Sequence, residues 1–278
     1  MPEFDTPEPI SVNLEFDIGS VRIIASKRTD TVVTVLPGNR AEDADIRAAQ
    51  QTKVSYTHGK LLVRGPRKRS LFGRSGSLEI SIALPSGSDI HATSPMADFT
   101  GQGRLGDCTL KTSAGDIQLD ETGSAQLRTT HGRVQVDRVA GNAEVTGSGR
   151  VAIGEVTGTA TVKNLNGETV VGEVTGDLRV NSSNGRIVVG IAHAGVQAKS
   201  AHGDIRIDDV ARGQVVLQTG AGDLEVGIRQ ATAAWLDINT GLGRVHNSLG
   251  AADGPTATGE TLEVRARTGL GDITIRRA

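Results

Sequence analysis

The chain has 278 residues, a net charge of −2 at pH 7 and only 2% aromatic residues. A weak net charge and few rings argue against nucleic-acid binding, which uses basic surfaces and aromatic stacking. The single cysteine, Cys108, excludes an intramolecular disulfide framework and a cysteine-ligated zinc site.

The N-terminus begins Met-Pro-Glu-Phe-Asp and lacks the basic and apolar regions of a signal peptide. No apolar run in the chain approaches the ~20 residues of a membrane span. From these two features we expect a cytoplasmic protein.

Residues 1–89 are predicted to form an irregular, β-rich N-terminal cap together with the first irregular coils of a repeat fold. Apolar residues alternate in Val12–Ile23, 58–63 and 78–84, which predicts strands. Between them, Ala41–Gln51 is predicted to be a short helix with Asn39 as its N-cap.

A basic loop is predicted at residues 66–76. Its charged and apolar residues are Arg67, Lys68, Arg69, Leu71, Phe72 and Arg74. A basic loop with an apolar tip suits contact with an anionic membrane surface or a partner, and a plain solvated loop is the alternative.

Residues 90–278 contain a repeat, x-Gly-[Asp/Arg/Glu]-[Ile/Val/Leu]-x-[Ile/Val]. Its anchor glycines are Gly115, Gly132, Gly149, Gly167, Gly185, Gly203, Gly222, Gly243 and Gly271. Successive anchors are 17, 17, 18, 18, 18, 19, 21 and 28 residues apart. A period of this size indicates one structural unit per repeat, each covering its neighbour.

Each repeat contains two stretches of alternating apolar residues, typical of strands with one buried face. A third short edge, Val-x-Gly, follows in several repeats, as at Val139, Val156 and Val174. Stacked in parallel, ~4.8 Å apart, the repeats predict an all-β, single-stranded β-solenoid with an insertion at residues 250–260. A left-handed hexapeptide helix is excluded because the glycines do not recur every six residues.

Stacking turns each sequence position into a column of side chains. Small hydroxyl or amide residues recur three places before the anchor, as at Thr219, and predict a hydrogen-bonded turn ladder. Acidic neighbours one place after it, Asp98/Asp116 and Asp204/Asp223, could hold a cation or be solvated. Cys108 falls in an inward column and is predicted to be a core residue.

Two features are candidate partner contacts. Ala152, Val170 and Val188 occupy the same outward position in three consecutive repeats and predict an apolar stripe. Trp235 is also outward by parity, and an exposed tryptophan is a candidate binding hot spot. Alternatively, the insertion at 250–260 folds over Trp235.

Catalysis is not predicted. The six histidines are dispersed, and no metalloprotease, nucleophile-elbow or P-loop motif occurs. We expect no catalytic, cofactor or metal site. A carbohydrate-active solenoid enzyme would need clustered carboxylates and aromatics, which the repeats do not supply.

The chain resembles the bacterial putative-adhesin β-strand-repeat family, also called the toastrack domain, with its actinobacterial branch the most similar. The resemblance rests on the repeats, on Phe4-Asp-Thr-Pro-Glu-Pro-Ile-Ser, on Ala49-Gln-Gln-Thr-Lys-Val-Ser-Tyr and on Gly243-Arg-Val-His-Asn. It implies a β-solenoid of the right-handed type without known catalysis, and some relatives are associated with cell-envelope stress. The adhesin label is a name rather than a demonstrated activity.

The leading hypothesis is a non-enzymatic binding or scaffolding protein that contacts a protein partner or a copy of itself. One alternative is a self-assembling filament similar to bactofilins, with the apolar stripe as its contact. The other alternative is a surface adhesin, which requires export.

Overall fold

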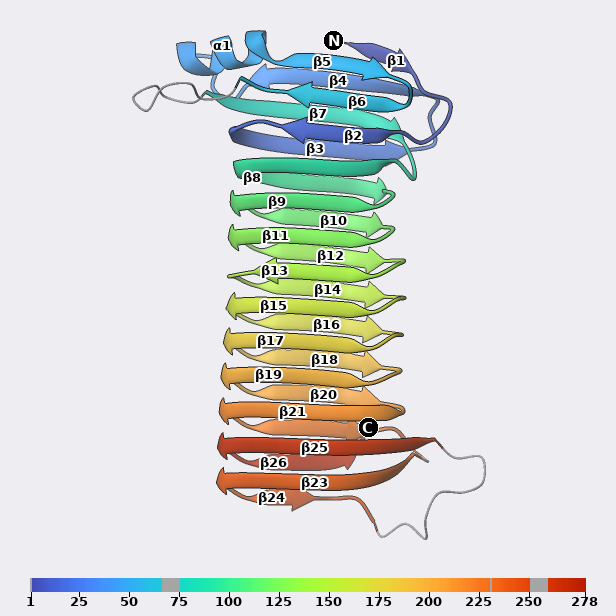
Figure 1. Cartoon of the computed structure of the whole chain (residues 1–278), viewed down its shortest axis with the longest axis vertical. Coiled ribbons are helices and arrows are strands. Elements are labelled where there is room, and N and C mark those ends of the chain that lie inside the picture. The colour runs from blue at the N-terminus through green and yellow to red at the C-terminus, as the bar shows by residue number, and fades with distance from the viewer. Residues whose placement is uncertain (1, 67–75, 231, 251–259) are drawn as a thin grey trace. The chain divides into compact units, whose positions relative to one another are not determined.

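The computed structural model describes residues 2–66, 76–230, 232–250 and 260–278. The chain divides into two compact units, residues 1–140 (unit 1) and 141–278 (unit 2). Apart from one helix, the regular structure consists of β-strands, most of them in parallel ladders that wind around an axis (Figure 1). The predicted all-β solenoid is confirmed.

Unit 1 contains the only helix of the described residues and twelve strands. They are β1 (Glu3–Asp5), β2 (Ser11–Glu15), β3 (Ile18–Ser26), β4 (Asp30–Pro37), α1 (Asp43–Gln51), β5 (Lys53–Thr57), β6 (Lys60–Arg64), β7 (Ser77–Pro85), β8 (Asp89–Arg104), β9 (Cys108–Ala114), β10 (Ile117–Thr122), β11 (Ala125–His131) and β12 (Val134–Val139).

The long strand β8 connects the irregular and regular parts of unit 1. Its first half pairs with β2 and β9, and its second half pairs with β3 and β10, all in parallel. The ladders continue through β9–β11 and β10–β12. Antiparallel pairs β1–β4, β4–β7 and β5–β6 complete the N-terminal part. The boundary predicted at residue 89 stays a prediction.

The helix α1 is shorter than predicted, and its cap differs. It begins at Asp43, and Glu42 occupies the N-cap position without a side-chain hydrogen bond. Asn39 instead closes the preceding turn, because its Oδ1 accepts the N–H of Ala41 at 3.0 Å. The carboxylate of Asp45 accepts the N–H groups of Asn39 and Ser77, both at 2.8 Å, and thereby ties the helix to β7.

The described core of unit 1 contains two aromatic rings. Phe16 and Phe99 are buried and meet edge to face, with ring centroids 6.4 Å apart. Cys108 and Leu110 lie in the adjoining buried column, only 1% exposed. The prediction that Cys108 is a core residue is therefore confirmed.

Unit 2 contains fourteen strands in the described residues. They are β13 (Ala143–Gly147), β14 (Val151–Val156), β15 (Ala160–Asn166), β16 (Thr169–Val174), β17 (Leu178–Asn184), β18 (Ile187–Ala192), β19 (Val196–His202), β20 (Ile205–Val210), β21 (Gly213–Ala221), β22 (Leu224–Ile228), β23 (Ala233–Leu242), β24 (Val245–Asn247), β25 (Thr261–Leu270) and β26 (Ile273–Arg277).

Two parallel ladders form unit 2, one from β13, β15, β17, β19 and β21, the other from β14, β16, β18, β20 and β22. Equivalent repeat positions lie side by side, as Ile187 and Ile205 do. The predicted third edge is not a separate strand, because β16 runs on through Glu173 to the buried Val174. Each coil therefore has two strands.

The turns between the two strands of a coil require glycine and small hydroxyls. Gly185 has φ +130°, and a Cβ there would collide with the carbonyl of Gly167 in the preceding coil. Thr219 Oγ1 donates to the carbonyl of Gly203 at 3.0 Å, and Thr268 Oγ1 donates to that of Gly222 at 2.9 Å. The predicted turn ladder is confirmed for these positions.

The last coils of unit 2 do not follow chain order. Strand β25 pairs with β21 on one side and with β23 on the other, and β26 likewise lies between β22 and β24. The coil of β25 and β26, last in sequence, is therefore covered by the coil of β23 and β24, which we call the end coil (Figure 1, β25 in red and β23 in orange).

The coil order also places the C-terminal strand β26 between two neighbouring strands. Arg276 Nε donates to Glu225 Oε1 at 2.8 Å, and Arg277 Nη1 donates to the carbonyl of Thr232 at 2.9 Å. Both arginines therefore stabilise the covered coil, Arg276 by bonding to β22 and Arg277 by bonding to the residue before β23. Residues 251–259 of the predicted insertion lie outside the described residues.

Candidate functional site

Exposed apolar side chains gather at the last two coils of unit 2. Seven large hydrophobic residues are exposed in the described part of the chain, and four belong to these coils. The four, which we call the end patch, are Trp235, Leu242, Val245 and Leu270. Leu242 and Leu270 are ladder partners, whereas Trp235 lies toward the other end of β23. Exposed apolar residues that concentrate in one region are typical of contact sites.

The end coil leaves its own inward column incompletely covered. Leu236 and Ile238 are half-buried, although Val264 and Ala266 beside them in β25 are fully buried. Leu242 is 70% exposed and pairs in the ladder with Leu270, which is 55% exposed. Leu236 and Ile238 are incompletely covered because each coil relies on the next for burial, and no strand of the described residues lies beyond β23. Leu242 and Leu270 stand at the turn before an anchor glycine, a position that is also exposed in covered coils, as at Asn184 and His202.

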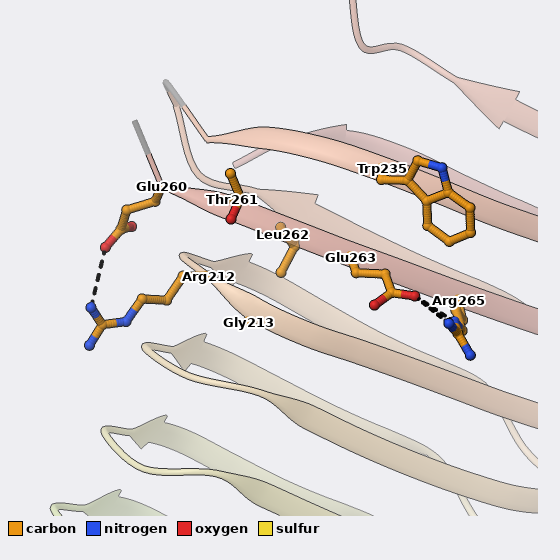
Figure 2. A pocket seen from close by; sticks show the side chains of 8 residues that line it. All are labelled: Arg212, Gly213, Trp235, Glu260, Thr261, Leu262, Glu263 and Arg265. Carbon is orange, nitrogen blue, oxygen red and sulfur yellow. Dashed lines mark hydrogen bonds and ion pairs between the residues drawn. The ribbon is translucent and has the colours of Figure 1, made fainter. Parts of the chain in front are cut away.

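Trp235 lies on the outer face of β23 beside an open groove of about 910 Å³ (Figure 2). Glu263, its ladder partner in β25, pairs with Arg265 at 2.6 Å. Glu260 and Arg212 form a second pair, 3.8 Å apart, at the other end of the groove. The groove thus presents an aromatic ring next to carboxylates that are already neutralised by guanidinium groups.

The sequence left two interpretations of Trp235, a contact residue or a residue covered by the insertion. Its side chain is 58% exposed, which agrees with the first. The covering segment itself falls largely on residues 251–259, outside the described residues, so that interpretation stays untested.

The apolar stripe forms in register as predicted. Ala152 pairs with Val170 in the ladder, and Val170 pairs with Val188. All three side chains are half-buried, and the next position in the column is Arg206. The stripe lies on β14, β16 and β18, whereas Trp235 lies on the ladder of β23, so the structure does not unite these candidates.

The basic loop cannot be placed. Arg67, Lys68, Arg69, Leu71, Phe72 and Arg74 all lie outside the described residues. Its contact with a membrane or a partner therefore stays a prediction.

The stacked aspartates have a structural explanation that the sequence did not reveal. Asp98 Oδ1 accepts the N–H of Asp116 at 2.8 Å, and Asp204 Oδ1 accepts the N–H of Asp223 at 2.9 Å. Each carboxylate therefore closes the turn of the neighbouring coil. Within the described residues, no group of three or more His, Cys, Asp or Glu side chains is arranged to hold a metal ion.

The pKa values of Asp116 and Cys108 are shifted in opposite directions by different causes. The backbone N–H of Arg133, which donates to Asp116 Oδ1 at 2.8 Å, lowers the pKa of Asp116, and the guanidinium of Arg133 adds to this effect. Burial raises the pKa of the Cys108 thiol to about 11, so the thiolate that would act as a nucleophile is disfavoured.

The helix of the described residues is too short and too polar to cross a bilayer.

Comparisons with known proteins find similarity to solved structures alone. No family model matches the chain, and no curated protein matches it. A putative adhesin from Parabacteroides merdae is 11% identical, with 100% of this chain and 95% of that chain covered and a TM-score of 0.40. A putative adhesin from Bacteroides fragilis is 14% identical over 99% of this chain and 95% of that chain, with a TM-score of 0.31.

A third solved structure has a different name. It is a putative lipid binding protein from Parabacteroides distasonis, 11% identical over 100% of this chain and 95% of that chain, with a TM-score of 0.28. At these identities and TM-scores the comparisons assign neither a family nor a function.

Proposed function

We propose that the protein is a non-enzymatic binding and scaffolding module that contacts a protein partner through the end patch. The observation that carries the proposal is the concentration of exposed apolar side chains on the last two coils, with Trp235 among them. Trp235 is an exposed tryptophan beside paired charges, and tryptophan is among the residues most enriched in binding hot spots.

The groove beside Trp235 favours binding over catalysis. Its two carboxylates, Glu260 and Glu263, are each paired with an arginine. A general acid or base has to be directed at the substrate, and both carboxylates are instead engaged by guanidinium groups. The same charges suit the rim of a protein interface, where they set orientation more than affinity.

Photo-crosslinking in living cells tests the proposal. A photoreactive phenylalanine analogue replaces Leu242, which is 70% exposed, and the matched control replaces Leu165, which is 57% exposed on β15. We expect a discrete protein crosslink from position 242 and none from 165. The additional substitution Trp235→Ala should lower the yield about tenfold, equivalent to ~1.4 kcal/mol of binding free energy.

Equal crosslinking from both positions would contradict the proposal, because exposure alone would then explain the reaction. The cytoplasmic location expected from the sequence stays a prediction, which cell fractionation tests.

A further inference from the structure

We propose that the partner is a second copy of this chain, which pairs edge to edge with β23 around a twofold axis at Ile238. The inference rests on the proposed function, because it identifies the occupant of the end patch. It is carried by the backbone direction of β23, by the composition of that edge and by the self-complementarity of its register.

The backbone groups of inward residues in β23 point away from β25. In each coil the first inward residue donates its N–H to the following coil, as Leu178 does to the carbonyl of Gly195 and Leu224 to that of Asp272. Leu236 occupies the position equivalent to Leu178. Because the direction repeats at every second residue, the N–H and C=O groups of Leu236, Ile238 and Thr240 point to the open side.

No strand of the described residues lies on that side, since β23 pairs with β25 alone. A row of free donors and acceptors is a template for another strand.

The edge also lacks the residues that normally prevent such pairing. Ten residues of β23 include no lysine, arginine or proline, and the one charge, Asp237, is paired with Arg267 at 3.3 Å. The edge strands of unit 1 are shorter than β23 and carry charged residues. Strand β5 has five residues and begins with Lys53, and β1 has three residues of which two are acidic. Short or charged edges resist association, whereas a long uncharged edge favours it.

Antiparallel pairing centred on Ile238 makes the edge complementary to itself. Ile238 then lies opposite Ile238 of the second copy, Leu236 opposite Thr240, and Ala234 opposite Leu242. All of these residues use the outward-pointing backbone groups, so every pair is hydrogen-bonded.

On the outer face of the same register, Trp235 lies opposite Gly241 and Asp237 lies opposite Asn239. No like charges meet, and an aromatic ring over a glycine is a stabilising pair at a sheet edge. The half-buried Leu236 and Ile238 of both copies would join one continuous apolar core.

A twofold contact uses the same edge in both copies, so it closes as a dimer instead of growing. The inference therefore differs from the filament hypothesis, which needs a second complementary surface.

Light scattering after size exclusion, over a hundredfold range of concentration, tests the inference first. We expect the molar mass to rise from 28.9 kDa to twice that value and to stop there. Ile238→Lys should restore 28.9 kDa at all concentrations with an unchanged circular dichroism spectrum. Val170→Lys, in the apolar stripe, should leave the dimer intact. Growth beyond the dimer, or loss of the dimer in Val170→Lys, would overturn the inference.

Disulfide formation tests the register without a destabilising charge. In a Cys108→Ser background, Ile238→Cys alone should form an intermolecular disulfide, because residue 238 faces itself at ~5.5 Å between Cα atoms. Leu236→Cys and Thr240→Cys should each form no intermolecular disulfide alone and should crosslink when the two proteins are mixed. Crosslinks in any other combination would contradict the register.

The dimer and the binding function can be refuted independently of each other. A wild-type monomer at every concentration, with a crosslink from position 242 to a different protein, overturns the dimer and leaves the binding function standing. A monomer without any crosslink from position 242 overturns both.

Discussion

The backbone N–H of Asp272 donates a hydrogen bond to Asp223 Oδ1 at 2.8 Å, although 49 residues separate the two in sequence. The N–H of Asp223 in turn donates to Asp204, and the N–H of Arg244 donates to Asp272 Oδ1 at 2.8 Å. The ladder thus runs 204, 223, 272, 244, and it identifies the end coil by direct contact. Each carboxylate in it closes the turn of the next coil.

Removing one acceptor from this ladder should weaken the last coils. Asp223→Ala should lower the free energy of unfolding by about 1 kcal/mol, because the N–H of Asp272 loses its partner. Asp223→Asn retains an acceptor oxygen and should cost less than half as much. Urea denaturation of the three proteins measures the difference, and equal stabilities would show that the carboxylate does not support the turn.

Acid should destabilise unit 1 partly through Asp116. The pKa of this carboxyl is lowered from its ordinary 3.8 by the N–H and guanidinium of Arg133. A lowered folded pKa means that the contribution is present above the ordinary value and is lost as pH falls through the folded value. Asp116→Asn should therefore lose less stability than the wild type below about pH 4. Parallel pH profiles in urea denaturation would contradict this assignment.

A methyl group at an anchor glycine should be far more damaging than one elsewhere in a strand. Gly185→Ala forces a side chain into φ +130° and against the carbonyl of Gly167, so we expect a loss of ~2 kcal/mol or more. Gly147→Ala is the control, since its new Cβ would approach Val151 Cγ2 at an ordinary 3.4 Å. Thermal denaturation should rank them in that order, and the reverse ranking would refute the glycine-ladder account.

Cys108 should be unreactive toward thiol reagents in the folded protein. Burial raises the pKa of its thiol to about 11, so little thiolate exists at pH 8 and reagents cannot reach it. A thiol-reactive chromophore should label it only at the rate of unfolding. Leu165→Cys, at an exposed site, should react at once. Rapid labelling of the wild type would place Cys108 outside the core.

Much of the fold could be predicted because one column pattern repeats. Ile187 and Ile205 pair as their equal distance from Gly185 and Gly203 implies. Val170 stacks between Ala152 and Val188 for the same reason. In-register stacking converts a period in the sequence directly into neighbours in space, so these contacts need no further information.

The order of the last coils could not be predicted from the same pattern. Strands β23 and β25 present nearly the same columns, since Leu236 is equivalent to Val264 and Ile238 to Ala266, so either fits beside β21. The two strands differ in the chain segments that lead into them. The anchor spacing is 21 residues before Gly243 and 28 residues after it, which gives the chain the length to pass over one coil and return to it. From the sequence alone, the longer spacing is interpreted as an insertion.

The end patch was only partly visible for a related reason. Trp235 was identified by parity, but Leu242, Val245 and Leu270 occupy positions that carry ordinary residues in other coils. Val245 occupies an inward position and is exposed because its coil is the outermost one. Leu242 and Leu270 stand directly before an anchor glycine, where side chains are exposed in covered coils as well, as at Asn184 and His202. The aspartate ladder was missed because its acceptors bind backbone N–H groups, which leave no trace in side-chain composition.

The coil order underlies both proposals, and one measurement tests it most directly. In a Cys108→Ser background, Gln218→Cys is combined with Arg267→Cys in one protein and with Asn239→Cys in another. Gln218 and Arg267 are ladder partners across β21 and β25, whereas Asn239 lies one strand further away. We predict an intramolecular disulfide between positions 218 and 267 and none between 218 and 239. A disulfide between 218 and 239 alone would place β23 next to β21 and contradict the account.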